Sequence, residues 1–304
     1  MLTSFKEIID TVRQEGAKRL AIPSVEKRDI ALLSMAAGAG LIIPCLLGNG
    51  KVIEGMIKKT ALKSLDYEII DQKDRGRALS TAIGLIRANR ADMLMQGGHD
   101  HQTLMDAVTD EKNGLKKGKL MSHISVFQLP KQKKLIFVTD TFINNGPTLA
   151  EKQMILEHAI RFAAIMKIDA PKVAVLAAIE QINLNIPSTL DAAILSKMSE
   201  RKQFGKAIVE GPIDIDCALS QAAAARKGLQ SPVTGNVDIY LAPEIDTGHL
   251  LAEALAFFGK LEFAGAIMGT TNPVIMHLPF VSDESMVVEI AIAALMCKKG
   301  GDNA

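Results

Sequence analysis

The sequence predicts an α/β protein with two lobes of mainly parallel sheet flanked by helices. Short apolar runs alternate with segments of helical spacing along most of the chain, and 48% of the 304 residues are hydrophobic. Short buried strands alternating with amphipathic helices favour a parallel sheet that is covered on both faces. Because a chain of this length commonly forms about two domains, we expect two such lobes.

The first part of the chain alternates regularly. The N-terminal residues MLTSFKEIIDTVRQEG are expected to form a charged amphipathic helix, and a short strand follows at Arg19–Pro23. Helical and strand-like spacings then alternate as far as Met95. The expected elements are a helix at Glu26–Ala37, a strand at Leu41–Leu47, a helix at Lys51–Lys59, a strand at Asp66–Ile70, a helix at Lys73–Asn89 and a strand at Ala91–Met95.

Two strand-like runs near the middle of the chain break this rhythm. Ser122–Leu129 and Lys134–Thr139 are separated by only a short polar segment, so they predict an antiparallel hairpin, because a parallel crossover needs a longer connection. A polar turn and a helix follow, as far as Ala164. The later expected elements are strands at Lys172–Ala178, Lys206–Val209, Asp238–Ala242, Phe263–Met268 and Val274–Met276, and helices at Thr189–Lys202, Ile215–Lys227, Gly248–Phe258 and Asp283–Lys298.

Composition excludes several classes of protein. The 35 basic residues balance 34 acidic ones, and no basic tract suits nucleic-acid phosphates, so we expect no nucleic-acid partner. The three cysteines are far apart in sequence, which disfavours a disulfide framework or a zinc site and fits the reducing cytoplasm. The apolar run Ala31–Leu47 contains glycines and a proline and is short for a membrane span. We expect no membrane partner.

Four expected strands end in glycine or polar residues. Ligands in open α/β sheets gather at the carboxyl ends of strands, although the same residue types also form ordinary turns. Neither a P-loop nor a dinucleotide fingerprint occurs in the sequence. The segments are Gln96-Gly97-Gly98-His99, Asp140 with Asn144-Asn145-Gly146-Pro147, Pro243 to His249, and Gly269-Thr270-Thr271-Asn272-Pro273.

Some polar residues leave alternatives open. Asp140, at the end of an apolar strand, has to cap the next turn, pair with a cation or take part in chemistry. His99 and His101 offer two metal ligands, but a metal site needs further ligands that the spacing does not supply. Ser188 and Asp191 have the spacing of a helix-capping pair.

Several short motifs follow one another in an order that resembles the phosphate acyltransferases, and the phosphate butyryltransferase branch more than the phosphate acetyltransferases. The resemblance runs from about residue 15 to residue 298. The motifs are Leu94-Met95-Gln96-Gly97-Gly98, Gly114-Leu115-Lys116, Leu120 to Phe127, Thr139-Asp140, Pro171 to Leu176, Gly211 to Asp216, Ser231-Pro232-Val233-Thr234-Gly235 and Gly269 to Pro273.

This resemblance implies a fold similar to that of the isocitrate and isopropylmalate dehydrogenases. One domain would contain residues 1–122 and 266–304, and the other would contain residues 123–265. The implied reaction is acyl-CoA plus phosphate giving acyl phosphate plus CoA, with coenzyme A as a substrate and no tightly bound cofactor. A homodimer is also implied, with the substrates between the lobes.

The chain departs from the family pattern at the arginines that the resemblance leads us to expect. The Ser-Arg pair near the last strand falls on Leu278 and Pro279, a second arginine falls on Asp106, and a third falls on Lys116. Lysine keeps the charge but lacks the guanidinium fork that matches two phosphate oxygens. A Gly-Asn pair reads Gly248-His249, and an Asp-Asn pair reads Asp216-Cys217.

Two main hypotheses follow from these departures. The first is a divergent enzyme in which Lys116, Ser282 and Glu284 carry the chemistry. The second is a non-catalytic paralogue that binds a CoA-type ligand or an acyl-processing partner. A metal-dependent enzyme using His99 and His101 is a third. The expected substrate-binding residues are Gly97, Gly98, Asp140, Asn144, Gly248, His249, Thr270 and Asn272.

Overall fold

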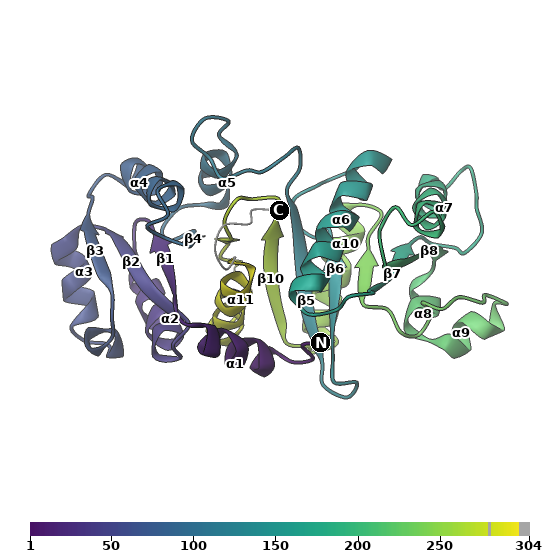
Figure 1. Ribbon diagram of the computed structural model, residues 1–304, viewed down its shortest axis with the longest axis horizontal. Coiled ribbons are helices and arrows are strands. Elements are labelled where there is room, and N and C mark those ends of the chain that lie inside the picture. The colour runs from purple at the N-terminus through teal and green to yellow at the C-terminus, as the bar shows by residue number, and fades with distance from the viewer. Residues whose placement is uncertain (279–280, 298–304) are drawn as a thin grey trace. The chain divides into compact units, whose positions relative to one another are not determined.

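The structure is a computed structural model that describes residues 1–278 and 281–297 (Figure 1). Pro279, Phe280 and the expected helix end at Lys298 lie outside the described residues. The chain divides into two compact units. The middle unit consists of Met1–Ser4 and Leu120–Phe263, and the split unit consists of Phe5–Lys119 and Ala264–Ala304.

The split unit is built on a five-stranded sheet with the order β11-β4-β1-β2-β3 (Figure 1). Every pair of neighbouring strands in it is parallel. Leu20, Ala21 and Ile22 are consecutive in β1 and all are fully buried, so helices cover both faces of the central strand. The strands are β1 (Lys18–Ile22), β2 (Ile42–Gly48), β3 (Glu68–Asp71), β4 (Met93–Met95) and β11 (Val274–Ile275).

A helix from the end of the described chain lies at the centre of the split unit. In α11 (Asp283–Met296) every residue from Met286 to Ala294 is buried, and the helix packs against α1, α2 and β11. The predicted packing of the last helix on the first lobe is therefore present. The other helices of this unit are α1 (Phe5–Glu15), α2 (Lys27–Gly38), α3 (Gly50–Ile57), η1 (Ala61–Ser64), α4 (Arg75–Arg87) and α5 (His101–Thr109).

The middle unit contains the predicted hairpin. Strands β5 (Ser122–Leu129) and β6 (Lys134–Thr139) pair antiparallel, whereas β6, β9, β7 and β8 pair in parallel. The sheet has the order β10-β5-β6-β9-β7-β8, and of β10 (Phe263–Met268) only the first residue belongs to the middle unit. The remaining strands are β7 (Lys172–Leu176), β8 (Ile208–Ile213) and β9 (Ile239–Leu241).

Helices flank this sheet, and aromatic residues lie in its core. Phe127, Phe137 and Phe162 are among the largest fully buried side chains. The rings of Phe137 and Phe162 meet edge to face, with their centroids 5.2 Å apart. The helices are α6 (Leu149–Ile165), α7 (Pro187–Glu200), α8 (Ile215–Leu219), α9 (Gln221–Arg226) and α10 (Ile245–Phe257).

The unit borders fall close to the expected ones. The chain changes unit after Lys119 and after Phe263, compared with expected borders at residues 122 and 265. Residues Met1–Ser4 lie with the middle unit rather than with the N-terminal helix. Leu2 accounts for this placement, because it is buried and its N–H donates to the carbonyl of Met166 at 3.0 Å.

Two local expectations were wrong, and one helix was not expected from the alternation of runs. The single helix expected at Ile215–Lys227 is two short helices, because Ser220 adopts an extended backbone and caps α9 through its hydroxyl. Ser188 does not cap α7, since that helix begins one residue earlier at Pro187. The alternation of runs also did not predict α5, whose N-cap is Asp100.

In the part of the chain that the structure describes, no helix is long and apolar enough to cross a membrane.

Candidate functional site

Asp140 follows β6 and holds the turn after it. Its Oδ1 accepts the N–H groups of Phe142 at 2.9 Å and Ile143 at 3.1 Å, and its Oδ2 accepts the amide of Asn144. The amide of Asn144 also donates to the carbonyl of Met121 at 2.8 Å. Burial raises the pKa of the Asp140 carboxyl, against these hydrogen bonds, which lower it. The capping interpretation of Asp140 is therefore confirmed.

Gly248 brings α10 against the Asp140 turn. A Cβ atom at Gly248 would lie 2.1 Å from the carbonyl oxygen of Asp140, so no larger residue fits without a shift of the backbone. His249 stacks edge to face on Phe142 with ring centroids 4.9 Å apart, and Phe142 stacks on His123 at 4.7 Å. The structure thus brings Asp140, Asn144, Gly248 and His249 together.

A buried polar network under this turn was missed by sequence reasoning. His123 Nδ1 lies 2.7 Å from the hydroxyl of Thr141, which is 2.9 Å from the hydroxyl of Ser125. Burial lowers the pKa of His123 to about 3, so its imidazole is neutral at physiological pH. The signal was present in the strand Ser122-His123-Ile124-Ser125, where polar residues interrupt an otherwise apolar run.

The middle unit also contains a pocket of about 760 Å³ at the carboxyl ends of its parallel strands. Helices α6, α7 and α10 begin beside it, so their positive ends face the pocket. The charged residues in its lining are Lys152, Asp191, Asp214 and Glu244, and its apolar lining includes Pro147, Leu176, Ala177, Ile215, Pro243 and Leu251.

Two of these carboxylates are already neutralised by lysines. Lys152 is buried and its ammonium lies 2.7 Å from Asp191, while Asp214 lies 2.9 Å from the ammonium of Lys227. Ser188 also lines the pocket. None of the predicted substrate-binding residues does, although Gly146 and Thr247, close in sequence to Asn144 and Gly248, do. Two of the four strand-end segments named from the sequence therefore line this pocket, through Gly146, Pro147, Pro243, Glu244 and Thr247, whereas the individual residues predicted to bind substrate do not.

In the split unit, Gly97 and Gly98 pack against the loop after β1. Gly97 has a φ of 60°, and a Cβ atom on it would lie 1.9 Å from the carbonyl oxygen of Pro23. The N–H of Gly98 donates to the carbonyls of Pro23 and Ser24. The close approach of backbone to backbone explains both glycines, and the N–H of Gly98 is used within the protein.

The other expected residues of the split unit lie apart from the two glycines. Lys116 is exposed and its backbone pairs with that of Thr270. The amide of Asn272 donates to the carbonyl of Asp92 at 3.1 Å, at the amino end of β4, whereas Gly97 and Gly98 follow its carboxyl end. Asn272 therefore does not share an edge of the sheet with the two glycines.

Ser282 and Glu284 lie at the start of α11. The hydroxyl of Ser282 caps the helix by accepting the N–H of Ser285 at 3.2 Å, and Glu284 is exposed in the first turn. A carboxylate there interacts favourably with the positive end of the helix. Among the residues that the structure describes, no hydrogen bond or ion pair joins Lys116 to either of them.

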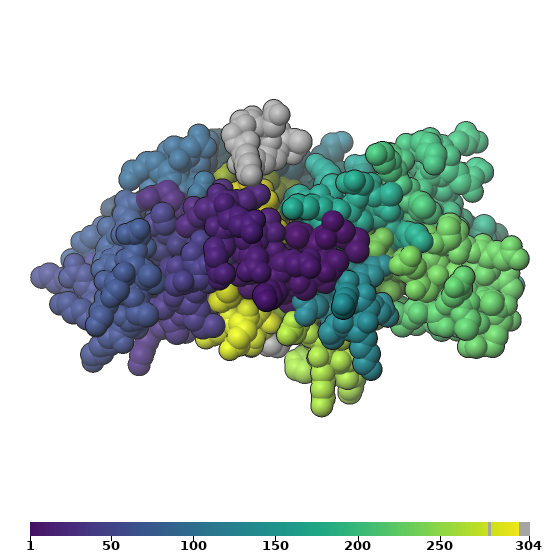
Figure 2. Space-filling model, turned by 60° about the horizontal axis from the view of Figure 1, so that its bottom comes forward, coloured from purple at the N-terminus to yellow at the C-terminus, as the bar shows by residue number. Residues whose placement is uncertain are grey.

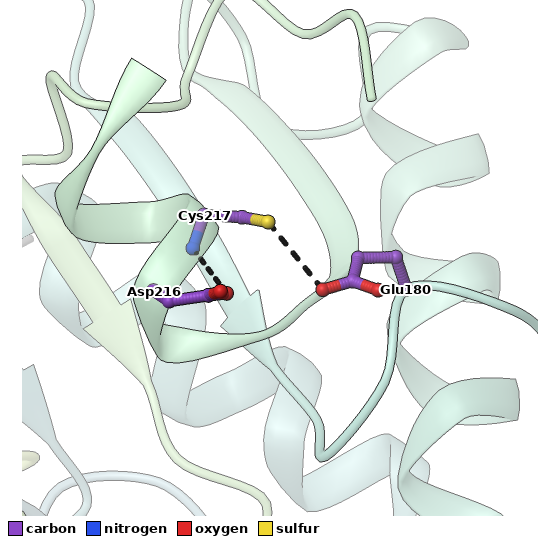
Figure 3. Close-up of side chains that lie close together, drawn as sticks. All are labelled: Glu180, Asp216 and Cys217. Carbon is purple, nitrogen blue, oxygen red and sulfur yellow. Dashed lines mark hydrogen bonds between the residues drawn. The ribbon is translucent and has the colours of Figure 1, made fainter. Parts of the chain in front are cut away.

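The histidine pair is not arranged as a metal site. The Nε2 of His99 lies 3.1 Å from the hydroxyl of Ser24, and that of His101 lies 2.8 Å from the carbonyl of His277. Burial lowers the pKa of His99. Among the described residues, one group of three potential metal ligands lies within 4.8 Å, and it consists of Glu180, Asp216 and Cys217 (Figure 3). Lys227 already supplies a cation to its two carboxylates.

Comparison with known proteins shows what the chain is similar to. A family model described as phosphate acetyl/butaryl transferase matches residues 16–294. The chain is 35% identical to the phosphate butyryltransferase of Clostridium acetobutylicum, over 97% of this chain and 99% of that protein.

Solved structures support the same relationship. A branched-chain phosphotransacylase from Enterococcus faecalis V583 matches 92% of this chain and all of its own, with a TM-score of 0.80 and 25% identity. A 4-hydroxythreonine-4-phosphate dehydrogenase from Klebsiella pneumoniae matches 93% of this chain and all of its own, with a TM-score of 0.53 and 14% identity. This second likeness concerns the fold alone, and it bears out the expected dehydrogenase-like architecture.

Proposed function

The chain belongs to the phosphate acetyl- and butyryltransferase family, and we propose that it transfers an acyl group between coenzyme A and phosphate. The observation that carries this proposal is the similarity to a phosphate butyryltransferase along almost the whole of both chains. Coenzyme A is then a substrate, and the reaction needs no tightly bound cofactor. We propose that the protein is cytoplasmic, because Cys45, Cys217 and Cys297 are all free thiols and the cytoplasm is reducing.

The reaction sets clear chemical demands. Towards acyl-CoA, the thiol of coenzyme A loses its proton and the sulfur attacks the carbonyl carbon of the acyl phosphate. A carbon–sulfur bond forms, the bond from the carbonyl carbon to the phosphate oxygen breaks, and phosphate leaves. This requires a base near the sulfur, a cation for the phosphate and hydrogen-bond donors for the developing oxyanion.

We propose that residues of the split unit take these roles, which requires the separate segments that carry them to meet around the substrate. Lys116 is the cation that meets the phosphate, because its ammonium is exposed and forms no ion pair with the residues that the structure describes. Thr270, whose backbone pairs with that of Lys116, supplies a hydroxyl beside it. Ser282 is a donor at the positive end of α11, and the exposed carboxylate of Glu284 is the base for the thiol.

The changed arginine positions fit a modified phosphate site. Leu278, which stands where the resemblance places a serine, is 4% exposed and belongs to the core, and Pro279, the arginine position beside it, lies outside the described residues. Asp106 accepts a hydrogen bond from Gln102 at 2.7 Å and lies on a groove with residues of α4. A lysine offers a point charge instead of a fork, so we expect weaker orientation of phosphate than an arginine would provide.

The pocket of the middle unit suits the neutral part of an acyl-CoA. Asp191 and Asp214 are each paired with a lysine, which leaves Glu244 as the uncompensated charge of the lining. Apart from the helix ends, the lining offers no uncompensated cation, and the carboxylate of Glu244 would repel the phosphates of coenzyme A. The apolar walls of the pocket suit the alkyl chain of the acyl group.

Among the other expected residues, His249 is the best donor in the middle unit. It is partly exposed, and its ring is held by Phe142 and by Glu253, whose Oε1 is 3.4 Å from His249 Nε2. We propose that it binds an oxygen of the substrate. Substrate contacts of Gly97, Gly98, Asp140, Asn144, Gly248 and Asn272 remain predictions, beside the structural roles described above.

We also propose that the protein is a homodimer. In α10 and at its end, Leu250 is 65% exposed and Phe258 is 91% exposed, and the yellow-green end of this helix stands out from the surface in Figure 2. Large apolar side chains at this exposure favour burial against a second copy. A monomeric mass in light scattering would contradict the proposal.

The activity is tested by the release of phosphate from acyl phosphates of graded chain length, with and without coenzyme A. We expect release that depends on coenzyme A and that falls by roughly 10²–10³-fold in Lys116→Ala, by analogy with the loss of one oxyanion-hole donor. Lys117→Ala is the matched control, because it removes the neighbouring ammonium. Equal turnover of Lys116→Ala and the wild type would contradict the role of Lys116. No turnover by the wild type would favour the non-catalytic paralogue.

A further inference from the structure

One ammonium connects two separate segments at the carboxyl end of the middle sheet. Lys227 Nζ lies 2.7 Å from Glu180 Oε1, 2.9 Å from Asp214 Oδ2 and 2.9 Å from Asp216 Oδ1. Glu180 belongs to the loop of residues 177–186 between β7 and α7, whereas Asp214 and Asp216 lie at the start of α8. We call Lys227 and these three carboxylates the Lys227 cluster.

Both connected segments form part of the pocket. Ala177 and Ala178 come from the first segment, and Asp214 and Ile215 come from the second. Lys227, Glu180 and Asp216 do not line the pocket themselves. The cluster therefore lies behind the pocket lining except for Asp214, which is part of that lining, and its ion pairs connect the two segments.

The loop of residues 177–186 is fixed at its start, where the N–H of Ala177 donates to the carbonyl of Ile213 at 3.0 Å, but its later residues have few contacts. After Ala177 no residue of this loop is buried, and Ile182 and Leu184 are 61% and 79% exposed. Hydrophobic burial therefore contributes little to its position. Its side-chain hydrogen bonds, among the described residues, are those of Glu180, those of Thr189 with Asn183 and Ile186, and one from the N–H of Asn185 to Asn183 Oδ1.

Charge makes the cluster sensitive to the loss of its lysine. Three carboxylates share one ammonium, and Lys227 lowers the pKa of both Glu180 and Asp216. A single exposed ion pair contributes little to stability, but a network around one cation contributes more. Without the ammonium, carboxylates from the two segments would repel one another and drive the segments apart.

Cys217 lies beside two carboxylates of this cluster, those of Glu180 and Asp216 (Figure 3). Its side chain is fully buried and its Sγ is 3.4 Å from Glu180 Oε1, so the thiol donates to the carboxylate that Lys227 binds. Burial and the two neighbouring carboxylates raise the pKa of this thiol to about 12. The thiol thus stays protonated and serves as a further hydrogen-bond donor to Glu180.

We propose that Lys227 is a positioning residue that fixes the pocket wall and thereby sets the discrimination between acyl chains of different length. This inference rests on the proposed function, since it assigns the alkyl chain of the acyl group to the pocket. Lys227 touches no substrate. It acts through Ala178 and Ile215, whose positions depend on the segments that it connects.

The experiment compares Lys227→Met with the wild type. Hydrogen–deuterium exchange without ligand should increase in residues 177–186 and 214–220 and stay unchanged in β5 and β6. The ratio of kcat/KM for butyryl-CoA to that for acetyl-CoA should change by roughly three- to tenfold, or about 0.7–1.4 kcal/mol. The change should appear mainly in KM, because the pocket binds the chain and does not perform the chemistry.

Two further variants separate positioning from general damage. Lys197→Met removes a lysine that pairs with Glu200 on the exposed face of α7, and it should change neither exchange nor discrimination. Adding Glu180→Gln and Asp216→Asn to Lys227→Met removes two of the three repelling charges and should restore the wild-type exchange of both segments.

Several results would overturn the proposal. Unchanged exchange in both segments would mean that Lys227 does not hold them, and a uniform increase across the middle unit would indicate global destabilisation instead. Altered exchange with an unchanged acyl-chain ratio would remove the link to discrimination. A wild type without turnover would refute the proposed function, and the exchange measurement would still decide whether Lys227 positions the wall.

Discussion

At the scale of single residues, the buried carboxyl group of Glu289 makes the stability of the protein depend on pH. It lies in α11, is 4% exposed, and its Oε1 has no hydrogen-bond partner among the described residues. Burial raises its pKa to about 8, against a lowering by the N–H of Gly265. The folded protein therefore binds a proton at neutral pH that the unfolded chain, with an ordinary glutamate, does not bind.

This difference predicts the sign of the pH dependence. The stabilising contribution of protonated Glu289 is complete below about pH 4.5 and is lost as the pH rises through about 8. Glu289→Gln should remove that loss and increase the free energy of unfolding at pH 8 by on the order of a few kcal/mol. Urea unfolding at pH 5 and pH 8 measures it, with the exposed Glu54→Gln as the control. An equal pH dependence in wild type and Glu289→Gln would contradict this account.

At the scale of elements, α10 and the turn after β6 depend on the absence of a side chain at Gly248. Alanine is normally better than glycine inside a helix by up to about 1 kcal/mol. At Gly248, however, the added methyl group would meet the carbonyl oxygen of Asp140 at 2.1 Å. We expect Gly248→Ala to destabilise the protein by about 1–3 kcal/mol, as overpacking does.

The control for this prediction carries the same substitution. Gly55 lies in α3, and a Cβ atom there would meet nothing within 4 Å, so Gly55→Ala should leave stability unchanged or raise it. Thermal unfolding of the two variants and of the wild type shows whether each substitution raises or lowers the stability. If Gly248→Ala were as stable as Gly55→Ala, the close approach of α10 to Asp140 would be wrong.

At the scale of elements, it is also clear which parts of the fold the sequence could predict. The hairpin of β5 and β6 was predictable because its connection is too short for a parallel crossover. The break between α8 and α9 was not, because Ala218 to Arg226 has good helix formers and only Ser220 interrupts them. The pocket and the Lys227 cluster depend on residues far apart in sequence, and spacing along one chain does not report such contacts.

At the scale of the whole molecule, the ordered motifs predicted the family, whereas the residues that bind substrate depend on details that motifs do not contain. Gly97 and Gly98 match the family's motif, yet they support the packing of one loop against another. We therefore propose, from the family, that this chain moves an acyl group between coenzyme A and phosphate in spite of its changed arginine positions.

The most direct test is the stoichiometry of the reaction. Butyryl-CoA is incubated with the purified protein, with and without inorganic phosphate, and free coenzyme A and butyryl phosphate are both quantified over time. The account predicts that the two products form in equal amounts and only when phosphate is present. Release of coenzyme A without phosphate would indicate hydrolysis of the thioester, and no release under either condition would indicate a binding protein. Either result would contradict the account.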